Sequence, residues 1–264
     1  MLNSKLLNSE TFKLKVLFSL AYLVFIFGTY KYNFADSIIQ GTVQPVVNFV
    51  EGKCFLQPKN MKLASTLPLK SGLIMDESFP YALVTGQDSY LEVLDYPKSK
   101  NILRLGQSSA IENRQPYHLF YFQGSSLISN RDYAKWRLET KSTLIHLYAR
   151  GTWMVETTEQ LGFKIVLLEG TLQVINENKT TKLNAGELLL VSEENGQISQ
   201  SIKIDLPLML NTCRLINNFE TKLPSLSRLI SAAQVQSIRL KKRYEAVVGG
   251  VKNKKLQIWA IKKE

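Results

Sequence analysis

Side chains that could catalyse a reaction or bind a metal are few in this sequence and lie far apart along it. The two histidines, His118 and His146, lie in aromatic, strand-like stretches, and neither has a second histidine nearby. A cupin-type metal site uses a clustered His-x-His with a carboxylate, because the metal needs several ligands at one place. We therefore predict no metal and no cofactor, and we interpret both histidines as ordinary core or surface residues.

The two cysteines, Cys54 and Cys213, allow two interpretations. They are the only cysteines in the sequence and are too far apart along it to form the C-x-x-C pair of a zinc site. In an exported protein they could form one long-range disulfide. Otherwise they are two buried free thiols.

Enzyme motifs are missing from the sequence. No segment matches a Gly-x-Ser-x-Gly nucleophile elbow, a Ser-x-x-Lys pair or the surroundings of a papain-like or caspase-like cysteine. Gly249 and Gly250 lack the Lys-Ser/Thr that completes a phosphate-binding loop. We predict that the protein is not an enzyme.

The strongest candidate for binding is the basic C-terminus. The formal net charge is +11, and residues 239–264 hold nine basic and two acidic side chains, interleaved with aromatic ones. Such a segment favours an anionic polymer or surface as its neighbour, although it is also typical of a solvated face. The candidate binding residues are Lys241, Lys242, Arg243, Lys252, Lys254 and Lys255.

One apolar stretch, residues 16–30 (VLFSLAYLVFIFGTY), predicts where these residues act. Lys13 and Lys15 precede it, so the positive-inside rule places the rest of the chain outside the cytoplasm, in the periplasm or the extracellular space. Its length fits a signal peptide or a short membrane anchor. We expect residues 1–35 to be a cytoplasmic stub with a single membrane anchor, or a cleaved signal, in which case the protein is secreted. Anionic lipid and polysaccharide are then the expected polyanions, and no nucleic acid is expected.

The rest of the chain is predicted to be mainly β. Short stretches of alternating apolar and polar residues, separated by Gly, Asn and Asp, predict a β-sandwich or roll over residues 36–220, with two sub-blocks at 36–128 and 140–220. Glu51-Gly52 and Glu169-Gly170 repeat one pattern, which suggests duplicated β units. From Pro224 the apolar spacing becomes helical, so residues 221–264 are expected to form one C-terminal helix and the basic tail.

Five motifs of this body, in their order, resemble the FecR-type periplasmic β-domain family. They are VNFVEGKC (47–54), LVTGQDSYLEVL (83–94), LRLGQSSAI (103–111), VLLEGTLQV (166–174) and KLNAGELLLV (182–191). The resemblance covers residues 40–218 and implies an envelope domain that contacts a partner. Family members that regulate a sigma factor do so through an N-terminal cytoplasmic region. About fifteen residues precede the apolar stretch here, so the sigma-regulating domain is not expected.

Taken together, these patterns predict a non-enzymatic, membrane-anchored envelope protein that binds a protein partner in sensing or assembly. Two alternatives belong to other classes. One is a secreted or periplasmic module that binds an anionic polysaccharide. Binding that weakens steeply as the salt concentration rises would favour this alternative. The other is a metal-dependent, cupin-like enzyme. Metal binding by both His118 and His146 would favour this second alternative.

Overall fold

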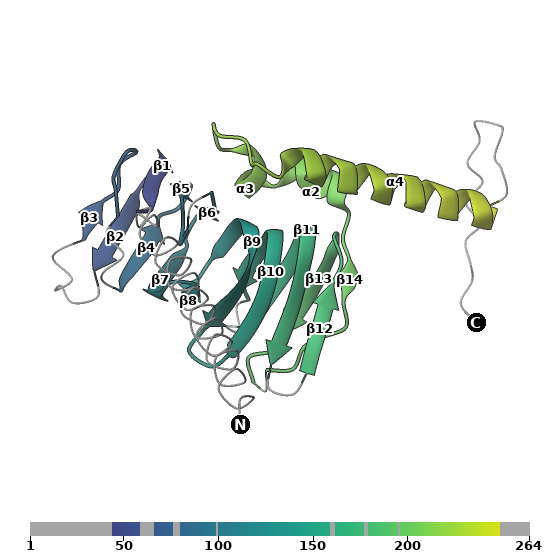
Figure 1. Cartoon of the computed structure of the whole chain (residues 1–264), viewed down its shortest axis with the longest axis horizontal. Helices are drawn as coiled ribbons and strands as arrows, with labels where there is room; N and C mark the ends of the chain where they lie inside the picture. Colours follow the sequence, from purple (N-terminus) through teal and green to yellow (C-terminus); the bar gives the residue numbers. More distant parts are fainter. Residues whose placement is uncertain are drawn as a thin grey trace, which may run out of the picture. The chain divides into compact units, whose positions relative to one another are not determined.

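The computed structural model describes residues 44–58, 66–75, 80–98, 100–158, 162–176, 179–194 and 196–248, with side chains up to residue 239. These residues form a mainly β protein with a C-terminal helix, which confirms the predicted fold class (Figure 1). The predicted membrane anchor lies outside the described residues. Within them, no helix is long and apolar enough to cross a membrane.

The strands follow the alternating stretches of the sequence. Strands and helices, in chain order, are β1 (Val46–Glu51), β2 (Cys54–Pro58), β3 (Leu67–Pro68), β4 (Tyr81–Thr85), β5 (Tyr90–Leu94), β6 (Ile102–Leu105), β7 (Ala110–Gln115), β8 (His118–Gln123), β9 (Ser125–Glu139), β10 (Leu144–Thr157), β11 (Phe163–Asn176), β12 (Lys179–Leu183), β13 (Glu187–Val191), β14 (Ile202–Lys203), α2 (Leu206–Thr212), α3 (Arg214–Asn217) and α4 (Leu226–Val248).

Three long strands, β9, β10 and β11, each belong to two layers of a sandwich. The first half of β9 pairs with β6, whereas its second half pairs in parallel with β8. The first half of β11 pairs with β13 and its second half with β12. Strand β10 lies between β9 and β11 along its whole length, so the same three strands join both layers.

Two facing glycines allow β10 and β11 to bend from one layer into the other. Gly151 and Gly170 are partners in the ladder and have φ angles of +118° and +99°, which side chains other than glycine rarely adopt. A Cβ at Gly170 would collide with the backbone carbonyl of Arg150, and one at Gly151 with the carbonyl of Glu169. The bend therefore requires glycine at both positions.

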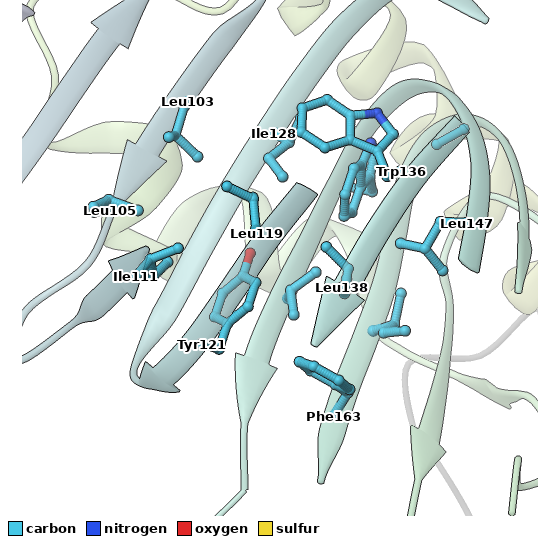
Figure 2. Close-up of a cluster of buried hydrophobic side chains, with 14 of the residues drawn as sticks. Leu103, Leu105, Ile111, Leu119, Tyr121, Ile128, Trp136, Leu138, Leu147 and Phe163 are labelled. Carbon is cyan, nitrogen blue, oxygen red and sulfur yellow. The ribbon is translucent and has the colours of Figure 1, made fainter. Parts of the chain in front are cut away.

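The main core fills the space between the layers (Figure 2). Trp136 and Trp153 are fully buried there, with ring centroids 5.5 Å apart in an edge-to-face arrangement. Leu103 of β6, Leu147 of β10 and Phe163 of β11 contribute to the same cluster. Full burial of each large apolar side chain contributes about 1.5–3 kcal/mol, so this cluster stabilises the sandwich.

A second apolar cluster lies between one layer and the helices. Tyr90, Leu127 and Leu168 face outward from their strands and pack against side chains of the helical segment, residues 206–233. Helix α4 begins two residues after Pro224, where the helical spacing starts in the sequence, and continues to Val248. The C-terminal end of α4 extends beyond the strands in Figure 1.

Candidate functional site

A buried arginine fixes α3 and the segment that follows it to the sheet. Nε of Arg104, on β6, donates a hydrogen bond of 2.6 Å to Glu92 Oε2 on β5, and neither side chain is exposed. The other guanidinium nitrogens donate to the carbonyl oxygens of Leu215 (2.9 Å), Ile216 (3.1 Å) and Thr221 (2.5 Å). We call this arrangement the Arg104 anchor.

Two further residues complete the Arg104 anchor. The ring centroid of Phe219 lies 4.2 Å from the guanidinium carbon, within the range of a cation–π contact. Nδ2 of Asn48 donates to Glu92 Oε1 at 2.6 Å and to Thr221 Oγ1 at 2.9 Å. Burial lowers the pKa of Arg104, whereas the charge and hydrogen bond of Glu92 raise it. A charge this well satisfied by its neighbours has a structural role.

A second contact, the Glu169 anchor, holds the start of α4. Glu169 on β11 is 6% exposed and accepts hydrogen bonds of 3.1 Å from both Nε and Nη2 of Arg228. Oγ1 of Thr152 lies 3.3 Å from Glu169 Oε1 and 2.6 Å from the hydroxyl of Ser225. The carboxylate of the second Glu-Gly pattern therefore binds the helix, whereas Glu51 of the first is exposed.

The anchored helices leave a groove open to solvent, the α2–α4 groove. It has a volume of about 620 Å³. Its walls are Pro207, Leu210 and Asn211 of α2, Asn217 of α3, and Leu226, Ile230, Ala233, Gln234, Ser237 and Ile238 of α4. Ile230 is 44% exposed and Ile238 is 55% exposed, although Leu229 on the neighbouring stripe is fully buried. The apolar surface of α4 is thus wider than the part that the β body covers.

The groove lies on a basic helix. Along α4 the sequence has Arg228, Arg239, Lys241, Lys242 and Arg243 against a single acidic residue near its end. Three of the predicted anion-binding residues, Lys241, Lys242 and Arg243, therefore belong to the last turns of α4. The other three, Lys252, Lys254 and Lys255, lie outside the described residues.

The cysteines are both free thiols in the structure, so it contains no bridge between them. Cys54 is buried, and its Sγ lies 3.5 Å from the carbonyl oxygen of Tyr90. Burial raises the pKa of the Cys54 thiol to about 11. Cys213 precedes α3, with its Sγ 3.9 Å from Met154 Sδ, and burial also raises its pKa. Cys54 is thus a buried thiol and Cys213 a half-buried one, and the long-range disulfide stays a prediction for an exported protein.

The histidines lie on the outer surface of the layer that does not pack against the helices. Nε2 of His118 is 2.9 Å from Glu139 Oε2, and His146 occupies the position across β10 from Arg137 of β9. Burial alone would raise the pKa of Glu139, but hydrogen bonds from His118 and Arg114 lower it. In the described part of the chain, no group of three or more His, Cys, Asp or Glu side chains could hold a metal ion.

Sequence reasoning missed the groove and both anchors. The signal for the anchors was present, because Glu92, Arg104 and Glu169 each interrupt an otherwise apolar strand. A charge at such a position needs a partner, but the sequence does not indicate which one. Helix α2 also had a signal, since Asp205 caps its start by accepting from the backbone N–H of Leu208 at 2.9 Å, with Pro207 in the first turn.

Comparisons with known proteins give only distant similarity. No family model matches the chain, and no curated protein matches it. Two crystal structures of a "putative anti-sigma factor" from Parabacteroides distasonis ATCC 8503, at 2.50 and 1.65 Å resolution, resemble part of it. Identity is 14% in both, with TM-scores of 0.41 and 0.40, over 52% of this chain and 65% of each of those chains, just under two thirds of their length. A likeness this distant does not assign a function.

Proposed function

We propose that this protein is a non-enzymatic, membrane-anchored envelope protein that binds a protein partner in sensing or assembly. In this proposal residues 1–35 are the stub and anchor, residues 36–220 the FecR-like β body, and residues 221–264 the helix and basic tail. The observation that carries the proposal is the α2–α4 groove, an apolar surface held open on a rigid support.

The groove suits a protein helix. Its walls come mainly from α2 and α4, and exposed apolar side chains such as Ile230 and Ile238 form a stripe along α4. An amphipathic helix binds such a groove by inserting its own apolar side chains at helical spacing. The two anchors fix the start of α4, so little ordering of this end of the groove is needed on binding, which favours affinity.

Charge narrows the chemistry of the partner. Besides Arg228, which is paired with Glu169, α4 carries four basic residues just beyond the groove, so the complementary surface is acidic. We therefore expect the partner to present an acidic amphipathic helix. Complementary charge of this kind speeds association more than it raises affinity, so the association rate should fall as salt increases.

Photo-crosslinking from the groove tests this function. A benzophenone amino acid replaces Ile238 in the full-length protein in its native host, and a matched control replaces Leu67, which is 52% exposed on β3. We expect a discrete protein adduct from position 238 alone, with an acidic amphipathic helix at the crosslinked site. Equal adducts from both positions, or adducts with lipid alone, would contradict the proposal.

Purified partner then allows a quantitative test. Ile238→Asp should weaken binding by about tenfold, because an exposed apolar contact is replaced by a charge that repels an acidic helix. The free energy of unfolding should stay within about 0.5 kcal/mol of wild type, since the residue is on the surface. An unchanged dissociation constant would place the partner elsewhere.

The membrane anchor needs a separate test. The N-terminal sequence of the native protein is determined from membrane and soluble fractions. A full-length chain in the membrane fraction supports the membrane anchor. A chain that begins near Asp36 in the soluble fraction would contradict the anchor and indicate a secreted protein.

A further inference from the structure

A second candidate surface lies away from the groove, on the outer side of the other layer. We call it the basic–aromatic face. Its residues are Tyr133, Lys135 and Arg137 of β9, Tyr148 and Arg150 of β10, Gln173 of β11 and Lys182 of β12. Neighbours that alternate with them, such as Trp136, Leu147 and Leu172, are fully buried in the main core, so the seven side chains point to solvent.

Strand register places these residues in rows. Lys135 is the partner of Tyr148, Tyr148 of Gln173, and Gln173 of Lys182, so one row crosses four strands. With strands about 4.8 Å apart, the row is about 14 Å long. Arg137 lies two residues along β9 from Lys135, about 7 Å away on the same side. The face therefore extends across four neighbouring strands, and cations lie at both ends of its long row.

The field on this face is positive. Lys135, Arg137, Arg150 and Lys182 are all exposed. Nearby Glu139 pairs with Arg114 Nη1 at 2.8 Å and His118 Nε2 at 2.9 Å, and also with Arg137 Nη2 at 3.8 Å. The charges of Lys135, Arg150 and Lys182 have no such acidic neighbour among the ion pairs of the described residues.

His146, at the edge of the face, senses the same field. Burial lowers its pKa first, and the charges of Lys135, Arg137 and His118 lower it further. The pKa shift agrees with the geometry, in which Arg137 lies between the two histidines in the ladder.

Aromatic rings lie among the cations. Tyr133 and Tyr148 are stacked, with centroids 6.2 Å apart and an interplanar angle of 26°, and Tyr133 is 53% exposed. Nζ of Lys135 lies 5.7 Å from the centroid of Tyr148. An exposed ring pair of this kind offers an apolar platform next to positive charge.

We propose that the basic–aromatic face binds a linear acidic polysaccharide that carries carboxylate or sulfate groups. Sugar rings would lie on Tyr133 and Tyr148, and the acidic groups would contact Lys135, Arg137, Arg150 and Lys182. A row with a cation at each end, and Arg137 and Arg150 beside it, matches a chain that carries negative charges at intervals. Gln173, in the middle of the row, supplies a hydrogen-bonding group between the charges. This site is independent of the protein-binding groove.

Binding of defined polymers to the full-length protein in non-ionic detergent tests this site. The probes are oligogalacturonate and heparin oligosaccharides, with neutral dextran, single-stranded dT20 and phosphatidylglycerol vesicles for comparison. Lys135→Gln/Arg137→Gln/Arg150→Gln should weaken binding of both acidic glycans by about tenfold, because three exposed charge contacts are lost. The matched control, Lys241→Gln/Lys242→Gln/Arg243→Gln, removes the same charge from α4 and should weaken it by less than about threefold.

An aromatic variant separates sugar recognition from charge alone. Tyr148→Leu keeps every charge and should weaken glycan binding by about fivefold while leaving vesicle binding unchanged. Circular dichroism of each variant checks that it is folded.

Several outcomes would overturn the site. One is that neither acidic glycan binds. Another is that the control triple variant on α4 loses as much affinity as the triple variant of Lys135, Arg137 and Arg150. This result would assign glycan binding to α4 and the tail. A third is that vesicles or dT20 bind more tightly than the glycans, which would replace a polysaccharide with a membrane or a nucleic acid.

Discussion

At the scale of single residues, Arg104 shows how a charge is accommodated inside this protein. Its guanidinium satisfies the Glu92 carboxylate and three carbonyl oxygens of the chain that follows α2. An ion pair of this kind adds little net stability compared with apolar residues, but loss of one partner is costly. Its specific effect is to fix one position of the helical segment on the sheet.

Arg104→Met should lower the free energy of unfolding by about 3–5 kcal/mol, because Glu92 stays buried without its cation. Urea denaturation measures the loss. The double variant Arg104→Met/Glu92→Leu should recover only part of it, since the carbonyls of Leu215, Ile216 and Thr221 still lack a donor. A loss below about 1 kcal/mol in the single variant would show that the anchor does not hold the segment.

His146 gives a prediction about pH. Its pKa is lowered in the folded protein by burial and by Lys135, Arg137 and His118. As the pH falls through the unfolded value of about 6.5 towards the lower folded value, the unfolded state binds the proton first, so stability is lost in this range. His146→Gln should therefore lose less stability between pH 7.5 and 5.5 than wild type. Thermal unfolding at both pH values measures this, and equal losses would be inconsistent with the cause given.

At the scale of elements, the bend of β10 and β11 decides the architecture. Gly151 and Gly170 face each other where the strands leave one layer and enter the other. The register also shifts next to the bend, between Ala149 and Gly151 on the β9 side and between Thr152 and Trp153 on the β11 side. Such irregularities increase bending and twist, so one strand can serve two layers.

Gly170→Ala should destabilise the fold by about 3 kcal/mol or more, because it adds a collision with the Arg150 carbonyl to an unfavourable φ. Gly72 is a matched control. Its φ is +84°, but a Cβ there would meet nothing within 4 Å, so Gly72→Ala should cost only about 1–2 kcal/mol of backbone strain. Chemical denaturation of both variants compares them, and equal costs would mean that the close approach of the strands is unimportant.

At the scale of the whole molecule, the shared strands couple the two layers. Trp136 and Trp153 come from β9 and β10 and lie in one core between the layers. Neither layer can be removed without breaking strands of the other. The helices are coupled to the same body through the second apolar cluster and the two anchors.

Unfolding of the described body should therefore be a single cooperative transition. Tryptophan fluorescence and far-UV circular dichroism should give coincident urea curves. Two separate transitions would instead support independent sub-blocks, such as residues 36–128 and 140–220.

Much of the fold could be predicted because alternation and turn residues are local signals. In the LVTGQDSYLEVL motif, residues 83–94, Gly and Asp separate two stretches that form β4 and β5. Residues 129–139 were left between the two sub-blocks, although Trp136 and Leu138 alternate there with charged residues as in any half-buried strand. The FecR-type resemblance and the membrane anchor stay predictions, since neither is tested by the described structure.

Local sequence patterns predict the β class of the body, the positions of most turns and the start of the C-terminal helix. Each of these depends on residues that are neighbours in the chain, through the two-residue period of strands, the helical spacing and the preferences of Gly, Asn, Asp and Pro. Other features depend on tertiary contacts. The strand partners, the Arg104 and Glu169 anchors, the groove and the basic–aromatic face each join residues that are distant along the chain. Such contacts depend on how the strands bend and pair, which local patterns do not encode.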